Sequence, residues 1–186
     1  MVTVTPIIVT QRLALTPMTH DDLAEWTRIV FADPDVMRYH NKSSLPAEER
    51  AARNLAWHNR NWSELGFGGL MITDRADGAL LGDVYLGPAD EAGEIELGYS
   101  VGREFWGRGI ATEASRAMVR YGFENRGLNR IAGFVAPVNV GSWRVLEKCG
   151  FVFEREDHLF GLDVHCYAIE ATSYEPDGSV YHVHPG

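Results

Sequence analysis

The fold of this chain is decided by the stretch Trp106-Gly107-Arg108-Gly109-Ile110-Ala111-Thr112-Glu113-Ala114. It follows a strand-like run over residues 94–101, and a helical pattern begins within it. Glycines at a strand-to-helix turn allow backbone N–H groups to approach a ligand closely, and the helix start adds a positive dipole end of about half a unit charge. Together these features predict a phosphate site, and the expected ligand is the diphosphate of a nucleotide-like cofactor.

Two common phosphate-binding motifs do not fit this turn. A dinucleotide fingerprint requires Gly-x-Gly-x-x-Gly, and when it is counted from Gly107 its third glycine position is Thr112. A Walker A loop requires Gly-Lys followed by Ser or Thr, and the chain has no such sequence. The first mismatch disfavours a dinucleotide-dependent oxidoreductase.

The length and charge of the chain indicate one acidic globular domain. A chain of 186 residues, 45% of them hydrophobic, buries roughly 70% of its unfolded surface and so forms a substantial core. The net charge of −9 argues against general nucleic-acid binding. Residues 103–148 nevertheless carry eight basic and four acidic side chains, and this local positive charge suits an anionic cofactor. The alternative is that Arg116, Arg120 and Arg126 pair with glutamates on the same helix face.

Hydrophobic runs, the N-terminal residues and the cysteines indicate the cellular compartment of the chain. No apolar run approaches the ~20 residues of a membrane span, and residues 1–20 lack the pattern of a secretory signal. Two cysteines, Cys149 and Cys166, make neither a disulfide framework nor a metal set. We therefore expect a cytoplasmic protein with a single domain over residues 1–172, followed by a loose tail over residues 173–186.

Hydrophobic periodicity predicts a mixed α/β protein with six to seven strands and about four helices. The predicted strands cover residues 7–16, 66–73, 79–86, 94–101, 130–136, 151–159 and 163–171. The predicted helices cover residues 19–31, with Thr19 as N-cap, and residues 45–65, 109–124 and 140–148. The strand–helix–strand unit over residues 94–136 has the form of a parallel crossover.

The glycine turn resembles the signature Gln/Arg-x-x-Gly-x-Gly/Ala of the GNAT superfamily of acetyl-CoA-dependent N-acetyltransferases. Gly109 and Ala111 match it, whereas Trp106 replaces the usual Gln or Arg. That replacement is typical of the RimJ/RimL-like branch of ribosomal-protein N-terminal acetyltransferases. Asn139-Val140-Gly141-Ser142 and Glu147-Lys148-Cys149-Gly150-Phe151 resemble a second element of that branch, and residues 11–17 resemble its first strand. The resemblance covers residues 8–171.

The resemblance implies the GNAT fold and acetyl-CoA as cosubstrate. Backbone N–H groups at the turn would hold the diphosphate, with the Thr112 hydroxyl added, and the strand end at residues 99–103 would pair with the pantetheine arm like an added strand. Asn139 is expected to contact the same arm. The expected cofactor-binding residues are Tyr99, Ser100, Val101, Arg103, Gly107, Arg108, Gly109, Ile110, Ala111, Thr112, Asn139 and Ser142.

Two residues are candidates for the chemistry. Strand parity places Glu94 and Glu96 on one face, and Glu96 is the candidate general base, the alternative being that both glutamates face solvent or pair with arginines. The resemblance implies that Ser142 protonates the departing thiolate. Many superfamily members use a tyrosine there, and no tyrosine stands at the matching position. Asn139 and Ser142 also fit a simpler role, as N-cap and third residue of a short helix.

Other reactive side chains have simpler explanations. His58 lies among tryptophans, where it either walls an acceptor pocket or packs in an aromatic core. Cys149 is expected to be a packed thiol, since direct attack by an amine needs no acyl-enzyme. His182 and His184 share a strand face without further ligands, so no metal site is predicted.

The sequence thus predicts an N-acetyltransferase that transfers acetyl from acetyl-CoA to a primary amine by direct attack in a ternary complex. The acceptor is either a protein N-terminus or a small molecule, and nothing in the sequence selects between them. No nucleic-acid or membrane partner is expected, and the family resemblance allows a homodimer. The alternative is a non-catalytic acyl-CoA-binding or sensor domain that keeps the cofactor turn without the chemistry.

Overall fold

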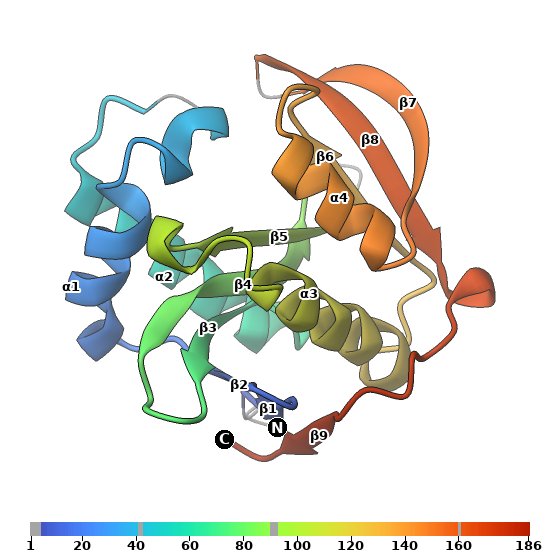
Figure 1. The fold of residues 1–186 in the computed structure, drawn as a ribbon, viewed down its shortest axis with the longest axis horizontal. Helices are drawn as coiled ribbons and strands as arrows, with labels where there is room; N and C mark the ends of the chain where they lie inside the picture. Colours follow the sequence, from blue (N-terminus) through green and yellow to red (C-terminus); the bar gives the residue numbers. More distant parts are fainter. Residues whose placement is uncertain (1–4, 41–42, 90–92, 160) are drawn as a thin grey trace.

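The computed structural model describes residues 5–40, 43–89, 93–159 and 161–186. Within these residues nine strands form one sheet in the order β7-β8-β6-β5-β4-β3-β2-β1-β9, shown in Figure 1. The strands are β1 (Ile7–Val9), β2 (Leu13–Pro17), β3 (Gly69–Asp74), β4 (Leu80–Pro88), β5 (Ile95–Val101), β6 (Arg130–Val135), β7 (Val152–Leu159), β8 (Leu162–Glu170) and β9 (His182–His184). Neighbouring strands are antiparallel except β5 and β6, which are parallel, as the predicted crossover requires.

Four α-helices cover the two faces of the sheet (Figure 1). They are α1 (Leu23–Trp26), α2 (Ala47–Leu65), α3 (Ile110–Arg120) and α4 (Val140–Lys148), and short 3₁₀ or π turns extend several of them. Alternate residues of β3 show the two-sided packing: Leu70 and Ile72 join the core under α3, whereas Met71 joins a second cluster with Trp26 and Leu55. None of the helices in the described parts of the chain is long and apolar enough to span a bilayer.

The predicted helices are confirmed with small shifts at their ends. The run predicted over residues 19–31 is a continuous sequence of 3₁₀, α and π turns, and it begins after Thr19, whose N–H donates to the Asp22 carboxylate over 2.7 Å. The helix predicted over residues 109–124 is α3 followed by a π turn over Tyr121–Asn125. Pro46 precedes α2, where its lack of an N–H has no consequence, and Gly66 ends the helix with φ +75°.

The single strand predicted over residues 7–16 is wrong, because these residues form the antiparallel hairpin of β1 and β2. Thr10 makes the turn: its N–H donates to the Leu13 carbonyl, and its hydroxyl oxygen accepts from the Leu13 N–H. Because a side-chain hydrogen bond closes this turn, it needs neither glycine nor proline. The sequence therefore showed no turn signal between β1 and β2.

The prediction of a loose C-terminal tail is also wrong. Figure 1 shows the last segment running past α3 to the edge of the sheet, where β9 pairs with β1. On the way, Asp177 forms an ion pair with Arg116 over 2.9 Å, and the Tyr181 hydroxyl donates to Asn125 Oδ1 over 2.6 Å. We call residues 174–186 the C-terminal strap.

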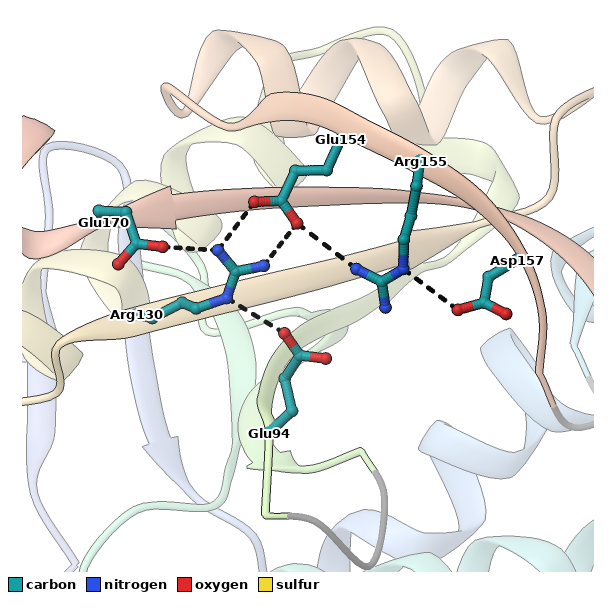
Figure 2. A network of polar contacts seen from close by, with 6 residues as sticks. All are labelled: Glu94, Arg130, Glu154, Arg155, Asp157 and Glu170. Carbon is teal, nitrogen blue, oxygen red and sulfur yellow. Dashed lines mark hydrogen bonds and ion pairs between the residues drawn. The ribbon is translucent and has the colours of Figure 1, made fainter.

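Strands β5 and β6 separate soon after they begin. Their parallel register has one pair, Glu96 with Ala132, although β5 continues to Val101 and β6 to Val135. Figure 2 shows what joins the starts of these strands: Arg130 binds Glu94 ahead of β5, Glu154 on β7 and Glu170 on β8. The network extends through Arg155 to Asp157. It therefore holds the two parts of the sheet together at one end while the strands diverge at the other.

Candidate active site

The diverging ends of β5 and β6 open into a cavity of about 650 Å³. It lies between the end of β5, the glycine turn that precedes α3, and the start of α4. Ten of the twelve residues expected to bind the cofactor line it, namely Tyr99, Ser100, Val101, Gly107, Gly109, Ile110, Ala111, Thr112, Asn139 and Ser142. The fold thus brings together residues from three separate segments, although their role in binding a cofactor stays a prediction.

Arg103 and Arg108 do not line this cavity. The Arg103 guanidinium forms an ion pair with Asp35 over 2.7 Å. The Arg108 guanidinium lies over the ring of Phe105, and its backbone carbonyl accepts a hydrogen bond from Arg12. Each of the two arginine side chains thus has a partner within the protein.

The turn before α3 combines two left-handed glycines with a helix start. Gly107 and Gly109 adopt φ values of +75° and +77°, in the left-handed region that favours glycine. A Cβ atom at Gly107 would meet nothing within 4 Å, so backbone conformation, not space, calls for glycine there. The helix begins at Ile110, and its first N–H groups have no partner within the helix. These groups and the helix dipole suit the anionic part of coenzyme A.

Positive charge and an unpaired strand edge add to this fit. Arg144 and Lys148, four residues apart on α4, both line the cavity. Beyond Glu96, the side of β5 that faces β6 has no register partner, which leaves backbone groups available to a strand-like ligand such as the pantetheine arm.

Of the three arginines whose pairing was left open, Arg120 pairs with Glu124 on its own helix face, whereas Arg116 binds Asp177 and Arg126 donates to the Leu65 carbonyl.

Ser142 is held by two neighbours. Asn139 caps α4, its Oδ1 accepting from the Ser142 N–H over 3.3 Å, so the simpler capping role is present. The Tyr99 hydroxyl lies 2.8 Å from the Ser142 carbonyl oxygen and 2.9 Å from Ser142 Oγ. Burial raises the pKa of Tyr99 above its ordinary value, so its phenol stays protonated. Sequence reasoning used only the backbone of Tyr99, although strand parity already placed its side chain opposite Glu96, on the face that α4 covers.

Glu96 faces the other side of the sheet, as strand parity predicted, and it does not line the cavity. Its Oε1 accepts a hydrogen bond of 2.8 Å from the Tyr85 hydroxyl on β4. Burial raises the pKa of Glu96, and the Tyr85 hydrogen bond opposes that shift. Glu94 differs, because it binds Arg130, so the alternative of pairing with arginine holds for Glu94. The base candidate is thus a half-buried carboxylate bound to a tyrosine, and no sequence motif pointed to that tyrosine.

The remaining reactive side chains lie in structural surroundings. His58 is buried against Trp57 and Tyr85, and burial lowers its pKa to about 3, so it packs as a neutral ring. Burial raises the pKa of the Cys149 thiol to about 12, which leaves it a packed thiol as predicted. Across the described ranges, no cluster of three or more His, Cys, Asp or Glu side chains is arranged to hold a metal.

Comparison with known proteins agrees with this arrangement. Residues 12–152 match the family described as acetyltransferase (GNAT) domain. The chain is 33% identical over 169 residues to YkkB of Bacillus subtilis, covering 90% of this chain and 96% of that protein. It is 32% identical over 154 residues to the FsC-acetyl coenzyme A-N(2)-transacetylase of Aspergillus fumigatus, covering 78% of this chain and 64% of that protein.

A solved structure gives the same result. Mycobacterium smegmatis RimJ in complex with CoA-disulfide superposes with a TM-score of 0.71 at 25% identity, covering 91% of this chain and 87% of RimJ. The family match spans the turn, the cavity and both catalytic candidates. The chain therefore belongs to the GNAT family of acetyl-CoA-dependent N-acetyltransferases, within its RimJ/RimL-like branch.

Proposed function

We propose that this protein transfers the acetyl group of acetyl-CoA to a primary amine by direct attack within a ternary complex. The observation that carries the proposal is the cavity between β5 and β6, in which a left-handed glycine turn, an unpaired strand edge and Ser142 meet. Residues 107–112 hold the diphosphate through backbone N–H groups. The end of β5 binds the pantetheine arm, and Arg144 and Lys148 add charge complementary to the phosphates.

Glu96 and Ser142 divide the proton chemistry between them. Glu96 accepts the proton of the attacking amine, directly or through a water molecule, as the new N–C bond forms. Ser142 donates a hydrogen bond to the sulfur as the C–S bond breaks, and Tyr99 holds the serine hydroxyl in place. A thiol with a pKa of about 8.5 is a fair leaving group, so this step does not need a strong acid.

The acceptor we propose is an α-amine, of a protein N-terminus or of a small molecule, acetylated in the cytoplasm. An α-amine has a pKa of about 7.7–8.0 and a lysine about 10.4, a difference worth roughly 3.3–3.7 kcal/mol of deprotonation. A single half-buried carboxylate is therefore a sufficient base for an α-amine. The net charge of −9 favours a cationic acceptor.

The first prediction tests Glu96 as the base. A panel of amines is screened by release of free thiol from acetyl-CoA, and the Glu96→Gln variant is measured with the best acceptor. We expect kcat to fall by about 10²–10⁴-fold, the usual contribution of a general base, while calorimetry gives an unchanged affinity for acetyl-CoA. Glu94→Gln is the matched control, since Glu94 lies two residues away and binds Arg130. It should keep kcat.

The alternative function, a non-catalytic acyl-CoA-binding domain, gives a different result in the same experiment. Such a domain binds acetyl-CoA tightly, yet no amine in the panel produces turnover. If the Glu96→Gln variant instead has the kcat of the unmodified protein, the protein is an enzyme but Glu96 is not its general base.

A further inference from the structure

Tyr85 lies across β5 in a way that depends on one glycine. In the antiparallel register of β4 and β5, Tyr85 faces Gly98, and Glu96 is the diagonal neighbour two residues along β5. A Cβ atom at Gly98 would lie 2.2 Å from the ring carbons Cε1 and Cζ of Tyr85. Only glycine at position 98 leaves room for the ring to lie over the strand, and this placement brings the phenol oxygen 2.8 Å from Glu96 Oε1.

Helix α2 holds the same ring from the other side. The Trp57 ring meets the Tyr85 ring edge to face, with 5.6 Å between centroids, and the His58 ring lies 5.0 Å away. Trp57 in turn occupies the space over Gly87, where a Cβ atom would lie 2.4 Å from the indole. Two glycines and two aromatic rings thus fix the direction of one hydroxyl group, and that hydroxyl donates to Glu96.

The charged groups around Glu96 leave Tyr85 as the neighbour that favours its ionised form. On α2, His58 is neutral, because burial lowers its pKa to about 3. On β4, Asp83 is a second carboxyl group, and burial raises its pKa to about 7. On β6, the partner of Glu96 in the register is Ala132, which carries no charge. Burial favours the protonated form of Glu96, and the hydrogen bond from Tyr85 acts in the opposite direction.

We propose that Tyr85 is a positioning residue for the general base: its phenol holds one oxygen of Glu96 and leaves the other oxygen for the acceptor amine. Gly98 is part of the same device, because it provides the space for the ring. The inference rests on the proposed function, in which Glu96 accepts the amine proton. Tyr85 itself does not exchange a proton with the substrate.

The test is the pH dependence of kcat/KM in the Tyr85→Phe variant. The bond from Tyr85 stabilises the ionised form of Glu96, so its loss moves the acidic limb of the profile to higher pH by about one to two units. Activity below the limb should fall about tenfold for each unit and recover at higher pH. The affinity for acetyl-CoA should not change. Tyr121→Phe is the matched control, a buried tyrosine whose hydroxyl lies 3.3 Å from the Gly66 carbonyl, and its limb should not move.

Gly98→Ala supplies an independent variant that keeps the phenol and displaces the ring. We expect it to move the acidic limb in the same direction as Tyr85→Phe, even if Tyr85→Phe folds poorly. An unmoved limb in a folded Tyr85→Phe or Gly98→Ala protein, together with an inactive Glu96→Gln, would overturn this inference alone. Full activity of Glu96→Gln would overturn the base assignment, and this inference with it.

Discussion

Asp83 is a carboxyl group buried where no charge is expected. Its side chain is 4% exposed and accepts a hydrogen bond of 2.8 Å from the Trp26 indole N–H. Burial raises its pKa to about 7, and the Trp26 bond opposes this only in part. Because the folded protein binds this proton more tightly than the unfolded chain, the stabilisation is complete below about pH 4 and is lost as pH rises through 7.

The raised pKa of Asp83 leads to a prediction for the Asp83→Asn variant. An amide oxygen still accepts from Trp26 and carries no charge, so the variant escapes the loss of stability at higher pH. At about 1.36 kcal/mol per pH unit, the difference in unfolding free energy should change by up to about 4 kcal/mol in favour of the variant between pH 4 and pH 7. Urea titrations of both proteins across this range measure it. Curves that stay parallel would mean that Asp83 has an ordinary pKa.

Single residues also show how far sequence reasoning reaches into the site. The turn at Gly107 and Gly109 was visible because a local motif requires glycine in left-handed conformations. Tyr85 and Tyr99 were not identified as partners of Glu96 and Ser142. Their hydroxyl contacts depend on the register between β4 and β5 and on how α4 packs, and neither is encoded in a local pattern.

The C-terminal strap is the element whose contribution sequence reasoning missed. Its strand β9 has three residues, too few to show the alternation by which a strand is recognised. The strap binds the second half of α3 through the ion pair of Asp177 with Arg116 and through Arg120, whose guanidinium lies 4.4 Å from the Tyr181 ring centroid. These contacts are exposed in part, so each is weak alone.

Deleting residues 174–186 tests the strap and, with it, the domain limit predicted at residue 172. The ion pair of Asp177, the hydrogen bond to Asn125, one cation–π contact and a three-residue strand pairing together contribute about 2 kcal/mol. For a protein of this size that corresponds to a fall in Tm of about 4–8 °C in a calorimetric scan. Tyr181→Phe, which loses only the bond to Asn125, should fall less. A deletion variant with an unchanged Tm would mean that the C-terminal strap adds no stability, as expected of a loose tail.

At the scale of the whole molecule, the sheet has two parts that meet where β5 lies beside β6. The crossover from β5 through α3 to β6 was predicted from its strand–helix–strand order, and the parallel pairing of β5 and β6 confirms it. That the two strands pair only at Glu96 and Ala132 was not predictable from periodicity, because both strands keep a regular strand pattern. The divergence is a tertiary feature: the Arg130 network joins the strands at their starts (Figure 2), and the cavity lies at their diverging ends.

The last prediction compares two glycines that differ only in their place in the molecule. Gly109, in the turn, and Gly178, in the C-terminal strap, have φ values of +77° and +72°. A Cβ atom at Gly109 would lie 3.5 Å from an Arg12 nitrogen and one at Gly178 would meet nothing. Alanine at either position therefore adds a backbone strain of about 1–2 kcal/mol without a steric clash. Both variants should lose similar stability without ligand.

Ligand-dependent stability separates the two variants. Acetyl-CoA at about 100 times its Kd adds about 2.7 kcal/mol to the stability of the unmodified protein, a rise in Tm of about 5–11 °C. Gly178→Ala should gain the same. Gly109→Ala should gain about 1.4 kcal/mol less stability at the same concentration, because its binding of acetyl-CoA is about tenfold weaker. The backbone at residue 109 relaxes to relieve its strain, and the N–H groups at the helix start then no longer point at the diphosphate. Equal gains in stability in the two variants would mean that the diphosphate binds away from the turn at Gly109. No gain in the unmodified protein at millimolar acetyl-CoA would mean that the cavity does not bind this ligand.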